Sequence, residues 1–265
     1  MPCVITLLAN PDKEKLSAAH VQRVADALAD KHITAERTLW LKDGIACDLF
    51  TNHDPRPAIH EILRSMPIDA IVQPAPKRKR KLLISDMDST MIACECIDEL
   101  ADFVGKKAHV AAITARAMNG EIDFAQALTE RVALLAGLPE STLQQCYDER
   151  VRMTPGAKEL LAAHKAAGGY SVLVSGGFSF FTSRVARELG FDEDRANTLE
   201  IKDNKLTGRV VLPILDKSAK LESLNTICIK LGIAPDDALA IGDGANDLPM
   251  LLAAGLGVAY HARSS

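Results

Sequence analysis

Two short acidic clusters in this chain have the residue types needed to attack and hold a phosphate group. Asp86 and Asp88 directly follow one short apolar run, and Asp243 and Asp247 follow another. Short apolar runs bounded by turn residues are typical of buried strands, so both clusters are predicted at strand ends. In a parallel sheet, ligands bind at the edge formed by the carboxyl ends of the strands. The sequence therefore predicts one acidic site at such an edge.

The spacing of Asp86 and Asp88 allows the two carboxylates to have different chemical roles. Because a turn re-aims each carboxylate, one of Asp86 and Asp88 can attack while the other transfers a proton. Four carboxylates at one edge of the sheet repel each other, and each like-charge pair costs about 4 kcal/mol at ~4 Å and an effective dielectric of ~20. Mg²⁺ relieves such repulsion and prefers a few carboxylate oxygens together with water and substrate phosphate. We therefore expect Mg²⁺ as the cofactor.

Three further features could bind phosphate oxygens. Ser175 and Gly176 lie in a Ser-Gly-Gly turn between a predicted strand and a predicted helix, where backbone N–H groups and a hydroxyl are available. Lys220 falls in the first turn of a predicted helix, where a cation is mildly unfavourable unless an anion lies nearby. Asn246 supplies a neutral side chain at the start of the last long predicted helix.

Composition and net charge argue against two classes of main binding partner and against a zinc site. The chain has 265 residues, 48% of them hydrophobic and 25% charged, with a net charge of −4. A nucleic acid or an anionic membrane as main partner is disfavoured, because proteins that bind these usually carry a basic excess. The six cysteines are scattered without the second pair that a zinc site needs. These features predict a cytoplasmic protein with reduced thiols that acts on a small molecule.

The first 76 residues are predicted to form a separate α+β module. Apolar periodicity gives the order βαββαβ, which suits a ferredoxin-like fold. The predicted strands are 3–9, 36–41, 45–50 and 68–73, and the predicted helices are 16–30 and 57–65. A Pro-Ala-Pro segment followed by five basic residues marks the exit from this module.

Residues 77–265 are predicted to form an α/β domain with an inserted helical unit. The chain is helix-rich at about 94–152, and helix and strand then alternate to the end, which implies a parallel sheet of Rossmann-like type. After residue 154, the predicted helices are 156–167, 178–189, 218–231 and 246–253, and the predicted strands are 170–174, 238–241 and 256–260, with a strand pair near 198–212.

Four segments in this order resemble the signature of the haloacid dehalogenase-like phosphatases, which consists of Asp-x-Asp, a Ser or Thr, a Lys, and Gly-Asp-x-x-x-Asp. The segments are Asp86-Met87-Asp88, Ser175, Lys220 and Gly242-Asp243-Gly244-Ala245-Asn246-Asp247. The resemblance covers about residues 80–260. Within the superfamily, the helical cap resembles that of the phosphoserine phosphatases, through Glu95-Cys96-Ile97-Asp98-Glu99-Leu100 and Arg131-Val132-Ala133-Leu134-Leu135.

The resemblance implies roles for these residues. It implies that Asp86 is a nucleophile that forms an aspartyl-phosphate and that Asp88 is the general acid and base. It implies Mg²⁺ held by Asp86, the Asp88 main chain and Asp243, with Asp247 orienting the metal shell. It further implies that the phosphoryl group is bound by Ser175, Gly176 and Lys220, with Asn246 beside it.

The resemblance also implies O-phosphoserine as substrate and serine and phosphate as products, in the last step of L-serine biosynthesis. The charges fit, because Glu95 can pair with an ammonium group and Arg131 can bind a carboxylate through two hydrogen bonds. Met118 and Phe124 resemble apolar residues that line the same pocket.

The first 76 residues resemble an ACT-like module, a fold often used to bind amino acids or to pair subunits, so a homodimer through this module is expected. Members of the family usually continue beyond Tyr260 by a strand and a helix. We therefore expect an unpaired sheet edge that lowers stability.

Two other functions remain open at this point. A phosphotransferase would pass the phosphoryl group to another hydroxyl acceptor such as homoserine. An amino-acid-binding regulatory protein would use the N-terminal module and keep only a vestigial phosphatase site. Intact Asp86, Asp88, Lys220 and Asp243 argue against the second alternative.

Overall fold

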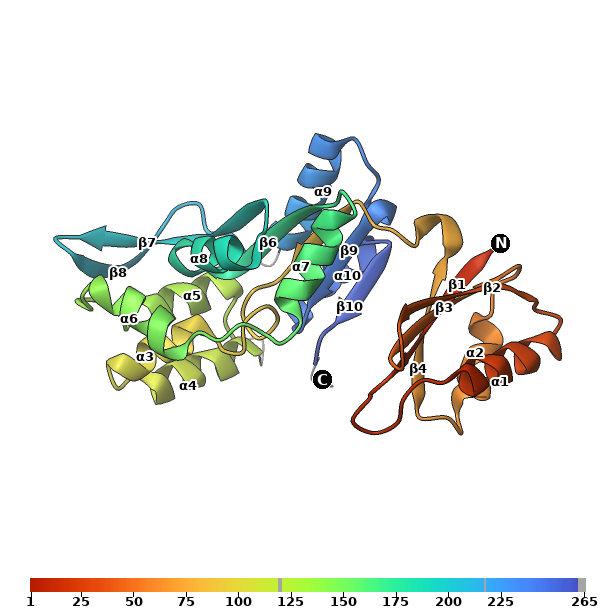
Figure 1. The fold of residues 1–265 in the computed structure, drawn as a ribbon. Helices are drawn as coiled ribbons and strands as arrows, with labels where there is room; N and C mark the ends of the chain where they lie inside the picture. Colours follow the sequence, from red (N-terminus) through yellow and green to blue (C-terminus); the bar gives the residue numbers. More distant parts are fainter. Residues whose placement is uncertain (119–120, 217, 262–265) are drawn as a thin grey trace. The chain divides into compact units, whose positions relative to one another are not determined.

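A computed structural model describes residues 1–118, 121–216 and 218–261, with no description of the Met118 side chain. The chain divides into two compact units, Met1–Lys79 and Arg80–Ser265 (Figure 1). Each unit has its own hydrophobic core, so each is described by itself. In the described part of the chain, no helix is both long and apolar enough to cross a membrane.

The first unit is a four-stranded antiparallel sheet with two helices. Its elements are β1 (Cys3–Ala9), α1 (Ala18–Ala29), β2 (Ala35–Lys42), β3 (Ala46–Thr51), α2 (Arg56–Leu63) and β4 (Ile68–Pro74), followed by the 3₁₀ turn η1 (Ala75–Lys77). The strand order is β2-β3-β1-β4. Alternate side chains of β1 and β3, such as Ile5 and Leu49, pack with Val24 and Leu28 of α1 in one buried cluster. The predicted βαββαβ order is therefore confirmed.

The second unit is built on a six-stranded sheet with the order β10-β9-β5-β6-β7-β8. The strands are β5 (Leu82–Ser85), β6 (Tyr170–Phe178), β7 (Glu193–Lys202), β8 (Lys205–Val211), β9 (Ala238–Gly242) and β10 (Leu256–Ala259). All neighbouring pairs are parallel except β7 and β8, which form an antiparallel ribbon. The short β10 lies at one end of this order, and among the described residues its neighbour is β9.

Helices cover both faces of this sheet. Successive side chains of the central strands point to opposite faces and are apolar on both, so both faces need a covering layer. Leu82 and Ile84 of β5 pack with α9 (Ala219–Leu231) and α10 (Leu248–Ala253). Leu83 belongs to the cluster that contains residues of α7 (Ala157–Ala166) and α8 (Ser179–Leu189). The 3₁₀ turns η2 (Pro235–Asp237) and η3 (Ala245–Asp247) flank β9.

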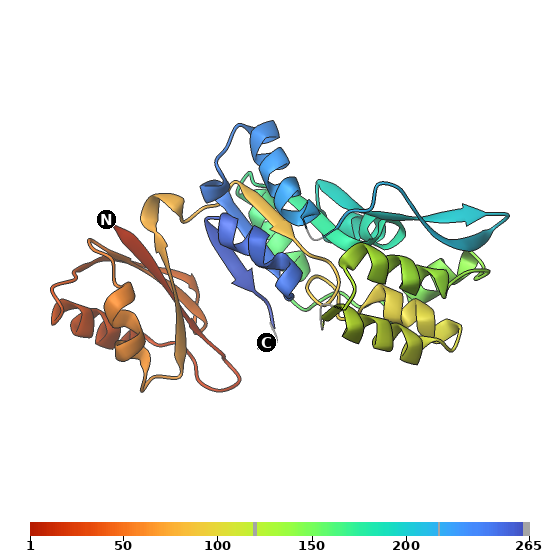
Figure 2. The same ribbon diagram turned by 180° about the vertical axis from the view of Figure 1, so that it is seen from behind.

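Four helices are inserted between β5 and α7. They are α3 (Cys96–Phe103), α4 (Lys107–Met118), α5 (Phe124–Ala133) and α6 (Ser141–Arg150), and Figures 1 and 2 show them grouped beside one another. Their apolar residues join the cluster that covers one face of the sheet. The expected α/β core with a helical insert and a small α+β module is thus confirmed.

Candidate active site

The ends of β5 and β9 bring the two acidic clusters together. The strands are parallel neighbours with Ser85 opposite Ile241, and the ladder continues when Asp86 N donates to Ile241 O at 2.9 Å. Gly242 is required at the end of β9, because a Cβ there would lie 2.3 Å from Cγ of Asp247. The absent side chain leaves room for that carboxylate to turn back toward β5.

Lys220, in the first turn of α9, reaches the same point from the other side. Its Nζ lies 2.9 Å from Asp86 Oδ1 and 2.6 Å from Asp247 Oδ1, and all three side chains are buried. Burial opposes the charge on Lys220, but the two carboxylates outweigh it and raise the pKa of the ammonium. Burial raises the pKa of Asp86 to about 8, and Lys220 acts in the opposite direction to favour its carboxylate.

Three carboxylates at this edge form a cluster suited to a metal ion. Oxygens of Asp86, Asp243 and Asp247 all lie within 4.8 Å of one another. With all three carboxyls ionised and Lys220 protonated, the group has a net charge of −2, which a divalent cation would balance. Thr90 Oγ1 donates to Asp243 Oδ1 at 3.1 Å and so fixes one member of the cluster. The donor set consists of hard oxygens, as Mg²⁺ requires.

Asp88 is placed apart from this cluster by the turn after β5. Its Oδ1 accepts from Cys96 N at 3.0 Å, and its Oδ2 accepts from Ser175 Oγ at 3.2 Å. Burial raises the pKa of the Asp88 carboxyl, although both hydrogen bonds stabilise the charged form. A carboxyl with a raised pKa beside a nucleophile is suited to proton transfer.

The Ser-Gly-Gly turn closes the third side of the site. Gly177 N donates to Ser175 Oγ at 2.8 Å. A Cβ on Gly176 would lie 2.9 Å from the Phe124 ring of α5, so a glycine lets the inserted helices come close to the turn.

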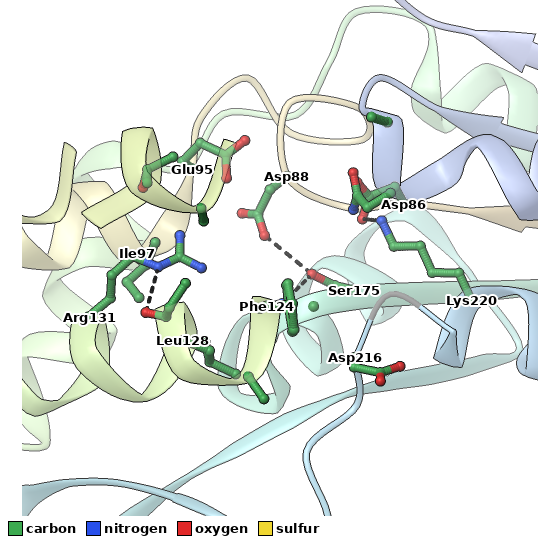
Figure 3. A pocket seen from close by; sticks show the side chains of 18 of the residues that line it. Asp86, Asp88, Glu95, Ile97, Phe124, Leu128, Arg131, Ser175, Asp216 and Lys220 are labelled. Atoms are coloured by element: carbon green, nitrogen blue, oxygen red, sulfur yellow. Dashed lines mark hydrogen bonds and ion pairs between the residues drawn. The ribbon is translucent and has the colours of Figure 1, made fainter. Parts of the chain in front are cut away.

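The inserted helices supply charges of both signs opposite the acidic centre. Figure 3 shows Glu95 and Arg131 on one side of the pocket, Asp86 and Lys220 on the other, and Asp88 between them. Burial, followed by the charge of Asp88, raises the pKa of Glu95 to about 7. Burial lowers the pKa of Arg131, whose Nε donates to the Ala127 carbonyl at 3.2 Å.

A single cavity of about 830 Å³ connects these groups. Nine of the ten residues proposed from the sequence line it: Asp86, Asp88, Glu95, Arg131, Ser175, Gly176, Lys220, Asp243 and Asn246. The tenth, Asp247, is fully buried and contacts the site through Lys220 and Gly244 N. Phe124 also lines the cavity. The side chain of Met118 lies outside the described residues.

The sequence reasoning missed two hydroxyl groups and one further carboxylate. Ser89 Oγ donates to Glu95 Oε1 at 2.7 Å, and Thr90 holds Asp243. Both follow Asp88 directly, so their place in the acidic segment was a usable signal. Asp216 also lines the cavity and accepts from Ser218 N at 2.7 Å. An aspartate before a helix reads as an ordinary cap in sequence.

Comparison with known proteins identifies the family. The model of the haloacid dehalogenase-like hydrolases matches residues 83–252. The chain belongs to this family. The chain is similar to a phosphoserine phosphatase from Albidiferax ferrireducens, with 54% identity over 70% of this chain and 80% of that protein.

Two further relatives of this haloacid dehalogenase-like hydrolase extend over more of its length. A phosphoserine phosphatase from Vibrio cholerae is 42% identical over 90% of this chain and 70% of that protein. The crystal structure of a haloacid dehalogenase family hydrolase from Salmonella enterica serovar Typhi covers 99% of this chain and 90% of its own, with a TM-score of 0.83 and 30% identity. The similarity therefore includes the N-terminal module.

Proposed function

We propose that this hydrolase is a phosphoserine phosphatase, which converts O-phosphoserine and water to serine and phosphate. The observation that best supports this proposal is that one cavity is lined both by the Asp86–Lys220 ion pair and by Glu95 and Arg131. The first pair suits a phosphate, and the second suits an amino-acid ammonium and carboxylate. The 54% identity to a phosphoserine phosphatase supports the same substrate.

In the proposed reaction, a carboxylate oxygen of Asp86 attacks phosphorus and forms an aspartyl-phosphate as the P–O bond to the serine oxygen breaks. Asp88 gives its proton to the leaving alkoxide. Asp88 then accepts a proton from water, whose oxygen attacks phosphorus and releases phosphate, so that Asp86 is restored. Ser175, Gly176, Lys220 and Asn246 bind the phosphoryl oxygens in this scheme.

We further propose Mg²⁺ as the cofactor. Asp86 and Asp243 would hold it with the Asp88 main chain, and Asp247 would orient the shell around it. When bound, the cation would neutralise phosphate charge and favour the carboxylate form of Asp86.

The decisive test of the proposed function is phosphate release from O-phospho-L-serine beside p-nitrophenyl phosphate, each with Mg²⁺ and with a chelator. We expect turnover only with the metal, and a higher kcat/KM for phosphoserine. Metal-dependent turnover that favours the aryl ester would leave a phosphatase with another substrate. A new phosphorylated product on addition of homoserine would identify a phosphotransferase instead.

Replacing Arg131 by methionine tests the substrate assignment. We expect kcat/KM for phosphoserine to fall by about 10²-fold or more, because a carboxylate would lose its charged partner in a partly desolvated pocket. p-Nitrophenyl phosphate has no carboxylate, so its turnover should change by less than about threefold. Both rates are measured by phosphate release at saturating Mg²⁺.

Arg150→Met is the matched control for this prediction. Arg150 also lies on an inserted helix, but its ion pairs are with Glu99 and Asp102 and it does not line the cavity. Equal losses on both substrates in Arg131→Met would remove Arg131 from carboxylate recognition.

We also propose that the N-terminal module pairs two copies of the chain. Strand β2 is an edge strand along which Leu39, Trp40 and Leu41 are exposed. An exposed apolar edge is a template for pairing with another strand. The sedimentation velocity of Trp40→Lys, compared with the unmodified chain, tests whether this edge carries the dimer.

A further inference from the structure

The Ser-Gly-Gly turn interrupts the pairing of β6 with β7. Along β6 and β7, Val174 pairs with Arg195 and Phe178 pairs with Asn197. Three residues of β6, 175–177, therefore oppose the single residue 196 of β7. The extra residues leave the ladder and form the turn at the cavity. Backbone groups in such a bulge need partners other than the neighbouring strand.

The side chain of Asn197 supplies one of these partners. It is 2% exposed, and its Nδ2 donates to Gly176 O at 2.9 Å and to Leu215 O at 3.2 Å. Its Oδ1 accepts from Leu215 N at 2.7 Å. A primary amide is the neutral side chain with two donors and an acceptor in one plane, so this geometry selects Asn.

A chain of hydrogen bonds links Asn197, through Gly176, to Asp88. The Gly176 carbonyl and the Gly177 N–H belong to one planar peptide group, so fixing the first also orients the second. Gly177 N donates to Ser175 Oγ at 2.8 Å. Ser175 Oγ in turn donates to Asp88 Oδ2 at 3.2 Å (Figure 3). Because the Gly177 N–H uses an acceptor site of the hydroxyl, the hydroxyl proton is directed at Asp88.

The bonds to Leu215 hold a second segment of the site. Leu215 immediately precedes Asp216, which lines the cavity and accepts from Ser218 N just before α9. Lys220 follows in the first turn of that helix. One buried amide thus ties the turn that contains Ser175 to the segment that leads to Lys220.

We propose that Asn197 is a positioning residue for the phosphatase reaction, acting through the Gly176–Gly177 peptide and the Ser175 hydroxyl on Asp88. This inference rests on the proposed function, in which Asp88 moves the proton. Asn197 does not line the cavity, so it acts only through the groups that it orients.

Asn197→Asp is the sharpest test. This substitution keeps the shape of the side chain and an acceptor for Leu215 N. It replaces the amide nitrogen Nδ2, which donates to two carbonyls, by an oxygen that cannot donate when ionised. We expect kcat for phosphoserine to fall by about 10²-fold, because small misplacement of catalytic groups is costly. KM should change by less than about threefold, since Glu95 and Arg131 are untouched. Asn197→Ala removes the two donors without adding a carboxylate. Its kcat tests the same expectation if the aspartate variant does not fold.

Thr198→Val is the matched control. Thr198 is the next residue of β7, and its hydroxyl is an exposed partner of Ser179 with no bond to the turn. We expect its kcat to stay within about twofold of the unmodified chain, as is usual for a surface change. Melting temperatures of all variants are measured beside the rates.

A double-mutant cycle with Ser175→Ala separates positioning from general stability. If Asn197 acts through Ser175, Asn197→Asp should lower kcat by less than about threefold once Ser175 is alanine, because coupled sites are not additive. The same loss in both backgrounds, or an unchanged kcat in Asn197→Asp and Asn197→Ala, would overturn the proposal.

Amide hydrogen exchange gives a readout independent of turnover. The Gly177 amide should exchange faster in Asn197→Asp than in Thr198→Val, and equal exchange would contradict the relay. An unmodified chain that does not hydrolyse phosphoserine would instead refute the proposed function. Normal turnover in both the unmodified chain and the Asn197 variants would refute the positioning role alone.

Discussion

Replacing Asp86 by asparagine should reduce phosphoserine turnover by at least about 10⁴-fold, since an amide cannot accept the phosphoryl group. The substitution preserves shape, and its Oδ1 can still face Lys220 Nζ, which lies 2.9 Å from the carboxylate of the unmodified chain. It also removes one negative charge from the three-carboxylate cluster, so that substrate phosphate should still bind. The loss should therefore appear in kcat, with little change in substrate affinity.

The measurement is phosphate release, combined with acid quenching during turnover of ³²P-labelled phosphoserine. The unmodified chain should carry label on protein, and Asp86→Asn should carry none. Asp236→Asn is the control, because Asp236 is an exposed residue before the start of β9, whereas the site lies after its end. Label or more than about a tenth of the normal rate in Asp86→Asn would rule out the covalent scheme.

The arrangement of the sheet could be predicted because its strands carry local signals. Leu82, Leu83 and Ile84 are all buried, as expected for a central parallel strand with both faces covered. The ends of the elements were harder to predict. β6 continues through the glycine turn to Phe178, where the sequence indicates that the strand stops at Val174. That extension depends on pairing with β7, which no local pattern encodes.

Within the site, the sequence was most informative where chemistry demands particular residue types. Asp86 and Asp243 could be grouped because strand ends meet at one edge. Lys220 was added through the resemblance to the haloacid dehalogenase-like signature. The burial of Lys220 between two carboxylates was not predictable, since a lysine in a helical first turn is usually exposed. Asn197 gave no signal at all, because it contacts Gly176 and Leu215, 21 and 18 residues away in the chain.

Replacing Lys220 by methionine should impair both catalysis and folding stability. Methionine has a similar length but no charge, so Asp86 and the fully buried Asp247 would lose their shared ammonium. Removing one partner of a buried ion pair costs about 3–5 kcal/mol, because the remaining charge is left without compensation. For a unit of this size, that loss lowers the melting temperature by on the order of 10 °C. Loss of the positive charge beside the phosphoryl group should also lower kcat by about 10³-fold.

Two variants separate these effects. Lys230→Met, on the exposed side of the same helix, removes a surface ion pair with Glu193 and should leave the melting temperature nearly unchanged, because solvent screens such a pair. Adding Asp247→Asn to Lys220→Met removes one of the two stranded carboxylates, so thermal unfolding should move back toward that of the unmodified chain while activity stays low. Recovery of stability without activity would show that Lys220 serves the reaction as well as the fold. If Lys220→Met instead kept its melting temperature, the carboxylates would not depend on the ammonium for compensation, and a bound proton or another cation would have to remove their charge.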